Sequence, residues 1–235
     1  IDEEDIAAVV EVLRSDWLTT GPKVKEFEEA VANYVGAKYA VSFSSGTAAL
    51  HAAAFAAGLG PGDEAITTPL TFCATANCAL YMGATPVFAD VSADTMNLDP
   101  ELVAMRITPR TKAILPVDYT GHPADLQAIL SLAVEHGLTV IEDGAHALGA
   151  EFRGRLVGGI SHMTMFSFHP VKHVTTGEGG MITTNNPEFA RKLRQFANHG
   201  IDPAARERQS QTEGQWYYEM TELGFNYRLP DTASA

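Results

Sequence analysis

A single lysine between a predicted strand and a glycine-rich turn is the residue of this chain that most clearly indicates reactive chemistry. Lys172 lies in the segment SFHPVKHVTTGEGG, which spans residues 167–180. The alternating run 163–168 predicts a strand before it, and three glycines predict a tight turn after it. A lysine held at such a place is partly desolvated, so it loses its proton more readily and attacks carbonyl groups. The segment therefore indicates Schiff-base chemistry, and the competing interpretation is a surface lysine in a hairpin.

A run of small residues, SSGTAAL at positions 44–50, follows the first predicted strand and opens a helix. Around Gly46, backbone N–H groups and hydroxyls are free to face a ligand, and the helix dipole favours an anion there. The run lacks the lysine and the spacing of a P-loop. It indicates a phosphate site, and the alternative is simple N-capping by Ser45 or Thr47.

Two further segments place reactive or flat side chains just after strands. Asp143 follows the buried run 139–141, where a carboxylate is poised to meet a protonated heterocycle, and His146 is three residues further on. Phe72 is predicted to begin a helix after another strand, where its ring is able to stack on a flat ligand. The alternatives are a capping role for Asp143, a polar core site for His146 and core packing for Phe72. Together, a phosphate cradle, a stacking ring, a carboxylate for a ring nitrogen and a Schiff-base lysine describe a binding site for pyridoxal 5′-phosphate.

Composition narrows the class of protein. The chain has 235 residues, 46% apolar and 19% charged, which predicts one large globular domain rather than two equal ones. A formal net charge of −13 disfavours nucleic acid or an anionic membrane as the main partner. Cys73 and Cys78 have neither metal-ligand nor redox spacing, so they are predicted to be reduced and buried in a cytoplasmic protein. No secretory signal and no apolar run long enough to span a bilayer is found.

Short β-branched runs alternate with helical patterns along the whole chain. This alternation predicts a doubly wound α/β structure with a largely parallel sheet, in which ligands bind beyond the carboxyl ends of the strands. The last two strands are joined by a link short enough for an antiparallel pair. The predicted strands are 39–43, 64–68, 86–89, 113–117, 139–141, 163–168 and 181–184, and the predicted helices are 3–14, 23–34, 47–57, 71–82, 125–136 and 188–198.

Five motifs together resemble the DegT/DnrJ/EryC1/StrS sugar aminotransferases, which are fold-type I enzymes. They are WLTTGP at 17–22, SSGTAAL at 44–50, EDGAHALGA at 142–150, SFHPVKHVTTGEGG at 167–180 and GFNYRL at 224–229. The resemblance covers essentially the whole chain. It implies a large domain with a mostly parallel seven-stranded sheet flanked by helices, and a small C-terminal domain beyond the given residues. The implied divisions are an N-terminal segment 1–20, a cofactor-binding domain 21–199, and a mobile loop with the start of the connection at 200–235.

The resemblance also implies roles for individual residues. Lys172 would hold the cofactor covalently and shuttle a proton, and Asp143 would pair with the pyridine nitrogen. His146 would lie near the phenolic oxygen, and Phe72 would pack on the ring. The remaining implied contacts are Gly46, Thr47 and Ser167 with the phosphate, Asn226 with the phosphate of a neighbouring subunit, and Leu18, Thr19, Thr20, Gly21 and Ser45 with the sugar. For Arg228 two roles stay open: binding the donor's carboxylate or binding the nucleotide.

The implied reaction is a two-step transamination in the cytoplasm of a homodimeric enzyme with shared sites. L-Glutamate would load the amine, and a nucleotide-linked 4-keto-6-deoxy sugar would accept it. The branch that serves pseudaminic acid biosynthesis is the most similar, which implies UDP-4-keto-6-deoxy-N-acetyl-β-L-altrosamine as the acceptor. Lys172 separates the chain from relatives with histidine there, which are dehydratases. The alternatives are another nucleotide keto-sugar, a non-catalytic relative of the fold, and a metal enzyme that uses His169 and His173.

Overall fold

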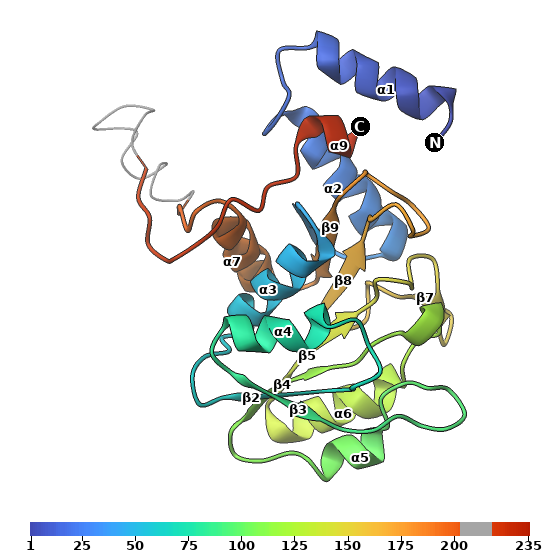
Figure 1. The fold of residues 1–235 in the computed structure, drawn as a ribbon, viewed down its shortest axis with the longest axis vertical. Coiled ribbons are helices and arrows are strands. Elements are labelled where there is room, and N and C mark those ends of the chain that lie inside the picture. The colour runs from blue at the N-terminus through green and yellow to red at the C-terminus, as the bar shows by residue number, and fades with distance from the viewer. Residues whose placement is uncertain (203–217) are drawn as a thin grey trace.

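A seven-stranded mixed sheet forms the centre of the molecule in the computed structural model, which describes residues 1–202 and 218–235 (Figure 1). The strand order is β1-β9-β8-β5-β4-β2-β3. Strand β9 is antiparallel to both of its neighbours, and the other neighbouring pairs are parallel. The strands are β1 (Tyr39–Phe43), β2 (Glu64–Thr67), β3 (Thr85–Phe88), β4 (Thr111–Leu115), β5 (Thr139–Asp143), β8 (Met163–Ser167) and β9 (Gly180–Thr184).

Helices cover both faces of the sheet. One face, here the α3 face, carries α3 (Gly46–Ala56), α4 (Ala74–Tyr81) and α7 (Pro187–Ala197). The opposite face, here the α6 face, carries α2 (Pro22–Val35), α5 (Pro100–Ala104) and α6 (Leu126–His136). Helices α1 (Glu3–Arg14) and α9 (Asp231–Ser234) lie together at the end of α2, close to both termini of the chain (Figure 1). A hairpin, β6 (Glu151–Phe152) with β7 (Arg155–Leu156), and a short 3-10 turn, η1 (Tyr119–Gly121), complete these elements.

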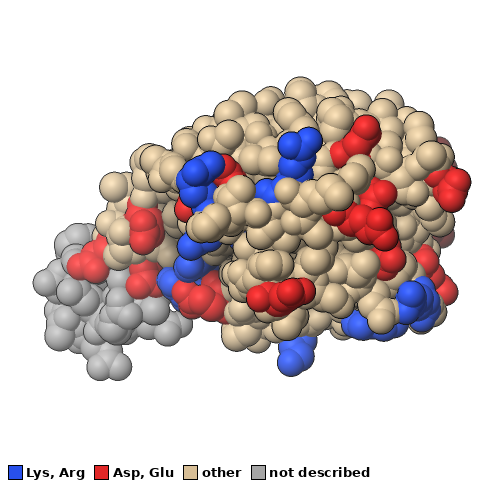
Figure 2. Space-filling view, turned by 90° about the horizontal axis from the view of Figure 1, so that it is seen from below, with Lys and Arg blue, Asp and Glu red and all other residues tan. Residues whose placement is uncertain are grey.

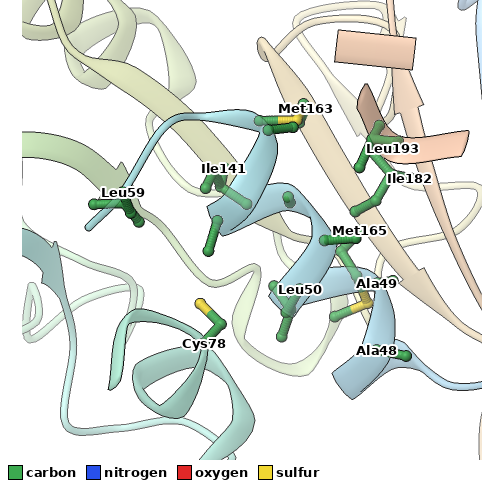
Figure 3. Packing of buried hydrophobic residues seen from close by; sticks show 14 of the residues in the cluster. Ala48, Ala49, Leu50, Leu59, Cys78, Ile141, Met163, Met165, Ile182 and Leu193 are labelled. Carbon is green, nitrogen blue, oxygen red and sulfur yellow. The ribbon is translucent and has the colours of Figure 1, made fainter. Parts of the chain in front are cut away.

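Helix α3 lies deepest, because its sequence GTAALHAAAFA offers small side chains on nearly every side. Figure 3 shows it against Ile141, Met163 and Ile182 of the sheet, with Leu193 of α7 beside them. Alanines let the helix approach the strands closely, and a helix that is apolar all round is stable only when it is buried. Each large aliphatic side chain in this core stabilises the fold by roughly 1.5–3 kcal/mol. The start of α3 is therefore fixed firmly against the ends of the strands.

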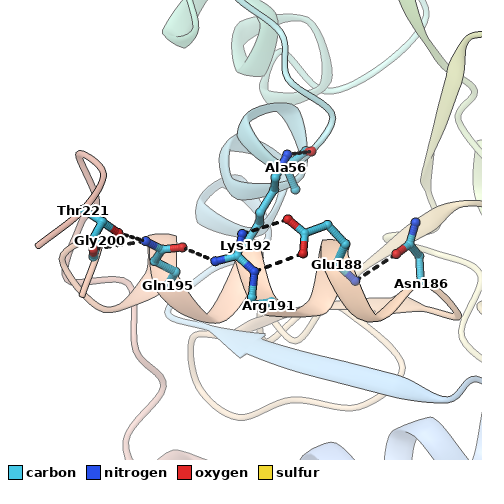
Figure 4. Close-up of polar contacts among 8 residues, drawn as sticks. All are labelled: Ala56, Asn186, Glu188, Arg191, Lys192, Gln195, Gly200 and Thr221. Atoms are coloured by element: carbon cyan, nitrogen blue, oxygen red, sulfur yellow. Dashed lines mark hydrogen bonds and ion pairs between the residues drawn. The ribbon is translucent and has the colours of Figure 1, made fainter. Parts of the chain in front are cut away.

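Helix α7 is amphipathic, and its polar side ties neighbouring segments together (Figure 4). Arg191 donates to both oxygens of Glu188 at 3.0 and 2.7 Å and to Gln195 Oε1 at 2.9 Å. Gln195 Nε2 in turn donates to the carbonyl of Gly200 at 3.3 Å. Lys192 Nζ reaches the last carbonyl of α3 at 3.4 Å. The chain that leaves α7 is thus held against the helix.

The charged surface is mixed in sign. Figure 2 shows one face on which acidic and basic side chains are interspersed over a mostly uncharged surface. Across the described ranges, every helix is too short or too polar to cross a membrane.

The predicted α/β fold is confirmed, and each predicted strand is present with ends that differ by one or two residues. The antiparallel placement of the last strand is also confirmed. Two details are wrong: α4 begins at Ala74 rather than residue 71, and Cys73 is exposed while Cys78 is buried. The cause is a turn at residues 68–70, in which Thr68 Oγ1 accepts from Leu70 N at 3.0 Å and delays the helix. The loop predicted at 200–214 falls mostly at 203–217, outside the described residues.

Candidate active site

Polar residues from four strands meet at one edge of the sheet. Strands β1, β5 and β8 end there, and the antiparallel β9 begins there, with Gly180 paired to both Phe43 and Ser167. Asp143 is the last residue of β5, and Ser45 is the second residue after β1. This edge is the carboxyl end of the parallel strands, where α/β sheets bind their ligands.

The loop before α3 forms a tight backbone cradle. A Cβ added to Gly180 would lie 2.4 Å from the carbonyl oxygen of Ser45, and one added to Gly46 would lie 3.2 Å from Ser167 Cβ. Ser45 is the N-cap of α3, and its hydroxyl accepts from Ala48 N at 3.1 Å. The capping interpretation is therefore correct for Ser45, yet the cap leaves the N–H groups of Gly46 and Thr47 in the first turn, where they favour an anion.

Asp143 is buried at the floor of this edge, with 5% of its surface exposed. Its Oδ2 accepts a hydrogen bond from Thr75 Oγ1 at 2.6 Å, and its Oδ1 accepts from Ala145 N at 3.2 Å. Burial raises the pKa of the Asp143 carboxyl, and the Thr75 hydroxyl opposes that rise. A carboxylate held in this way is a strong acceptor for a positively charged N–H. Thr75 was missed by the sequence reasoning, since nothing local separates it from other threonines.

Lys172 and His146 are in direct contact, with Nζ and Nε2 2.6 Å apart. Burial lowers the pKa of His146, and the nearby positive charge of Lys172 lowers it further. A neutral His146 accepts a hydrogen bond from the lysine at Nε2. The turn that carries His146 is fixed by the bond from Ala147 N to the carbonyl of Gly144 at 2.8 Å. The lysine is thereby aimed at the loop that follows Asp143.

Phe72 is 74% exposed and precedes α4, so the core-packing interpretation is wrong. Its carbonyl accepts from both the N–H and the hydroxyl of Thr75, each at 3.2 Å. Because the same hydroxyl reaches Asp143, the exposed ring lies one turn from the floor of the site. An exposed aromatic ring in this position is available to a flat ligand.

Asn226 and Arg228 lie on a segment that passes between α7 and the loop that opens α3. The carbonyl of Tyr227, between them, accepts from Ser44 N at 2.7 Å. Asn226 pairs with Asn198 in an isolated antiparallel bridge, and Arg228 Nη1 donates to Asn198 Oδ1 at 2.7 Å. Both residues are thus anchored next to the loop that opens α3.

Of the residues predicted for the sugar pocket, Ser45 lies at the cradle, and the other four lie elsewhere, just before α2. Leu18, Thr19 and Thr20 are exposed, and Gly21 donates its N–H to Asp231 Oδ2 at 2.7 Å. Asp231 also accepts from Lys23 N at 2.9 Å and donates its own N–H to the carbonyl of Leu18 at 3.1 Å. These bonds join the segment to α9, rather than to Lys172 or Asp143.

In the part of the chain that the structure describes, no group of three His, Cys, Asp or Glu residues is placed to hold a metal ion. His169 lies 3.9 Å from Glu178 instead. The groups that do converge are an anion cradle, a lysine and a buried carboxylate. They fit a phosphorylated aldehyde whose ring carries a basic nitrogen.

The fold and this arrangement are those of the large domain of the fold-type I aminotransferases. Residues 1–235 match the DegT/DnrJ/EryC1/StrS aminotransferase family, and the chain belongs to it.

Three known proteins illustrate the relationship. Spore coat polysaccharide biosynthesis protein SpsC of Bacillus subtilis is 48% identical over 235 residues, which cover 100% of this chain and 60% of SpsC. The structure of Helicobacter pylori PseC, an aminotransferase involved in the biosynthesis of pseudoaminic acid, has a TM-score of 0.90 at 37% identity and covers 100% of this chain and 61% of its own. The structure of NtdA from Bacillus subtilis with bound cofactor PMP has a TM-score of 0.87 at 31% identity. The match covers 100% of this chain and 52% of the NtdA chain. The chain thus spans about 60% of the length of SpsC and PseC.

Proposed function

We propose that the protein is a pyridoxal 5′-phosphate-dependent transaminase that moves an amino group from L-glutamate to a nucleotide-linked 4-keto-6-deoxy sugar. The observation that carries this proposal is the contact of Lys172 Nζ with His146 Nε2 at 2.6 Å, beside the buried carboxylate of Asp143. The lysine and the carboxylate stand at the same sheet edge as the cradle formed by Gly46 and Ser167. A nucleophile, an acceptor for a ring N–H and an anion site are what this chemistry requires.

Each residue of the core site has a task. When bound, the cofactor supplies an electrophilic aldehyde and a ring that withdraws electrons from the carbon beside the amine. Lys172 would hold that aldehyde through its Nζ, and its amine would accept and return the proton of the substrate carbon. Asp143 keeps a proton on the ring nitrogen, because a buried carboxylate is stabilised by a cationic partner. His146 orients the lysine, and lies on the side of the phenolic oxygen.

The cradle binds the phosphate and the aromatic ring positions the cofactor plane. Gly46 and Thr47 offer N–H groups at the start of α3, and Ser167 offers its hydroxyl from the end of β8. Phe72, exposed and one turn from Thr75, packs on the face of the ring.

The substrate side is built from the edges of this chain and from a second copy. We assign Leu18, Thr19, Thr20, Gly21 and Ser45 to the sugar. The exposed positions of the first three support contact with groups outside this chain. Asn226 reaches the phosphate of the partner subunit in a homodimer, and its anchoring beside Ser44 supports this role. Arg228 binds either the carboxylate of the donor or the nucleotide.

We divide the protein into an N-terminal segment at 1–20, a cofactor-binding domain at 21–199 and a connection at 200–235. A cytoplasmic location is supported by two cysteines that are both free thiols.

The proposed acceptor is UDP-4-keto-6-deoxy-N-acetyl-β-L-altrosamine, in pseudaminic acid or related surface-glycan biosynthesis. The likeness to PseC supports it, at 37% identity. A second candidate is a different nucleotide keto-sugar, which the higher identity of 48% to SpsC favours. A non-catalytic relative of the fold is the third, and the retention of Lys172 with Asp143 argues against it.

The test of the reaction uses purified full-length protein loaded with the cofactor. Borohydride should bleach the visible band and fix the cofactor onto the protein, and peptide mapping should find the adduct on Lys172. Lys172→Arg should lose both the fixed adduct and turnover. Lys112→Arg, an exposed lysine on β4, is the matched control and should retain both. A wild-type protein without a fixed adduct would refute the proposal.

The acceptor is tested with the same protein and a panel of nucleotide 4-keto-6-deoxy sugars. Glutamate alone should convert the aldehyde chromophore to that of the aminated cofactor, and the true acceptor should restore it. Restoration by UDP-4-keto-6-deoxy-N-acetyl-β-L-altrosamine supports the first candidate. Restoration only by another nucleotide sugar supports the second, and loading without any restoration contradicts both.

A further inference from the structure

Two buried carboxyl groups lie beneath the site, on the other face of the sheet. Asp118 is 1% exposed and Glu142 is 0% exposed. Successive side chains of a strand point to opposite faces, so Glu142 points to the α6 face while Asp143 points to the α3 face. Val117 pairs with Asp143 in a parallel bridge, which places the next residue, Asp118, on the same face as Glu142. The two carboxyls therefore share one buried layer.

Each carboxyl has one oxygen with a donor and one without. Asp118 Oδ1 accepts from Ala124 N at 2.9 Å, and Glu142 Oε2 accepts from Thr164 Oγ1 at 2.6 Å. Asp118 Oδ2 and Glu142 Oε1 are buried and have no donor among the described residues. A buried carboxylate oxygen without a donor is strongly unfavourable, and in the described ranges no ion pair reaches either group. One proton placed between the two oxygens satisfies both at once.

The charges around the pair act in the same direction. Burial raises the pKa of Asp118 well above its ordinary range, and the neighbouring Glu142 carboxylate raises it further. Burial also raises the pKa of Glu142, and hydrogen bonds from the Thr164 and Ser161 hydroxyls and from Asp118 oppose that rise. Asp143, on the other face of β5, adds repulsion to both. Among these facing groups there is no cation. The buried Ser161 hydroxyl, which has no partner in the described residues, is a further donor for Glu142, and a retained proton relieves the repulsion between the two carboxyls.

The pair is connected to the candidate active site through the backbone. Asp118 donates its N–H to the carbonyl of Asp143 at 3.0 Å, and Asp143 donates its N–H to the carbonyl of Pro116 at 2.8 Å. Gly121, three residues further on, has a φ of +88° and packs so closely that an added Cβ would lie 2.6 Å from the carbonyl oxygen of His146. The turn that carries Asp118 thus touches the backbone of both Asp143 and His146.

We propose that Asp118 and Glu142 hold a single proton between them at neutral pH, and that the resulting O–H···O bond positions the backbone of Asp143 and His146. The two are positioning residues, since neither faces the cradle. The shared proton does not depend on the proposed function. Its effect on cofactor binding does rest on the proposed function.

Infrared spectroscopy of the full-length, cofactor-free protein tests the shared proton. Wild-type protein at pH 7 should show the carbonyl stretch of a protonated carboxylic acid. Asp118→Asn and Glu142→Gln should each abolish that band, because an amide N–H then takes the place of the proton. Asp143→Asn, a control on the opposite face, should keep it. Absence of the band in wild type, or its persistence in both single variants, would overturn the proposal.

Unfolding provides a second readout with a definite sign. A carboxyl whose folded-state pKa is raised contributes stability that is complete below its unfolded pKa, about 4, and that declines as pH rises towards the folded value. Relative to Asp118→Asn, the unfolding equilibrium constant of wild type should therefore rise by up to about tenfold per pH unit above that point. A constant ratio across pH 4–8 would contradict a shared proton.

The positioning role is tested by rescue. Asp118→Ala should weaken cofactor binding by about tenfold or more, whereas Asp118→Asn, which restores a hydrogen bond to Glu142, should stay near wild type. Equal affinity in all three proteins, with the infrared band present, would remove the positioning role. A protein that binds no cofactor in any form would instead contradict the proposed function and leave the infrared result standing.

Discussion

Replacing Thr75 by valine removes the hydroxyl that donates to Asp143 Oδ2 at 2.6 Å and keeps the branched shape of the side chain. A hydrogen bond to a buried charged group is worth about 1.5–3 kcal/mol. The ionised carboxylate loses that stabilisation, so the substitution should raise the pKa of Asp143 further. Thr75→Ser keeps the hydroxyl and is the matched control.

The sign of the pH dependence follows from burial. The pKa of Asp143 is already raised in the folded protein, so its contribution to stability is complete below the unfolded pKa and declines as pH rises to the folded value. In Thr75→Val the folded-state pKa is higher, so the decline continues to higher pH. The stability lost by the variant should therefore be smallest in acid, where Asp143 is protonated in both proteins, and should grow by about 1.5–3 kcal/mol at higher pH.

Urea unfolding of the cofactor-free, full-length protein at several pH values between 4 and 8 measures this difference. Thr75 also bonds to Thr71 and to the carbonyl of Phe72, and the loss of those neutral bonds adds an offset that does not vary with pH. A difference between wild type and Thr75→Val that is the same at every pH would refute the assigned role of the hydroxyl.

Three further outcomes are expected. Gly180→Ala should lower the unfolding free energy by about 3 kcal/mol or more, because its Cβ would meet the carbonyl of Ser45 at 2.4 Å. Gly60→Ala, whose Cβ would make an ordinary contact with Asp63 Oδ2 at 3.9 Å, should change it by less than about 0.5 kcal/mol. Thermal unfolding compares the two variants, and equal losses would contradict the clash. Burial lowers the pKa of His51, so its contribution to stability is present above its ordinary pKa near 6.5 and is lost as pH falls. In urea unfolding at a series of pH values, His51→Phe should therefore lose less stability than wild type as the pH falls below that point. An equal loss in both proteins would refute this. Asp231→Ala should lower the unfolding free energy by about 2 kcal/mol, since two N–H groups at the start of α2 lose their acceptor, and Asp231→Asn should recover part of that loss in the same assay.

Sequence patterns predicted those features of the fold and the site that depend on residues close together in the chain. The alternation of strands and helices determined the fold, and the positions of Lys172, Asp143 and Gly46 after strands placed them at one edge. Those inferences need only the period of the side chains and the rule for parallel sheets. The structure brings these three residues together at that edge.

Contacts between distant segments could not be predicted in this way. Thr75 reaches Asp143 only because α4 packs beside β5, and Asp231 caps α2 from the other end of the chain. Asp118 is one of many aspartates until its burial and its lack of a donor are known. The exposure of Cys73 depends on where α4 begins, and helix boundaries are the least certain part of any sequence pattern.

The antiparallel strand β9 determines when the sheet of this protein is able to complete its folding during synthesis. Its register joins Tyr39 to Thr184, so the first strand of the sheet has no neighbour until the last strand has left the ribosome. Pairing across such a long stretch of chain requires a large loop-closure entropy, and it is slow for that reason. The cradle between Ser45 and Gly180 closes only at that step. Cofactor capture by a nascent chain would thus report that the whole sheet has assembled, and shorter nascent chains should not acquire it.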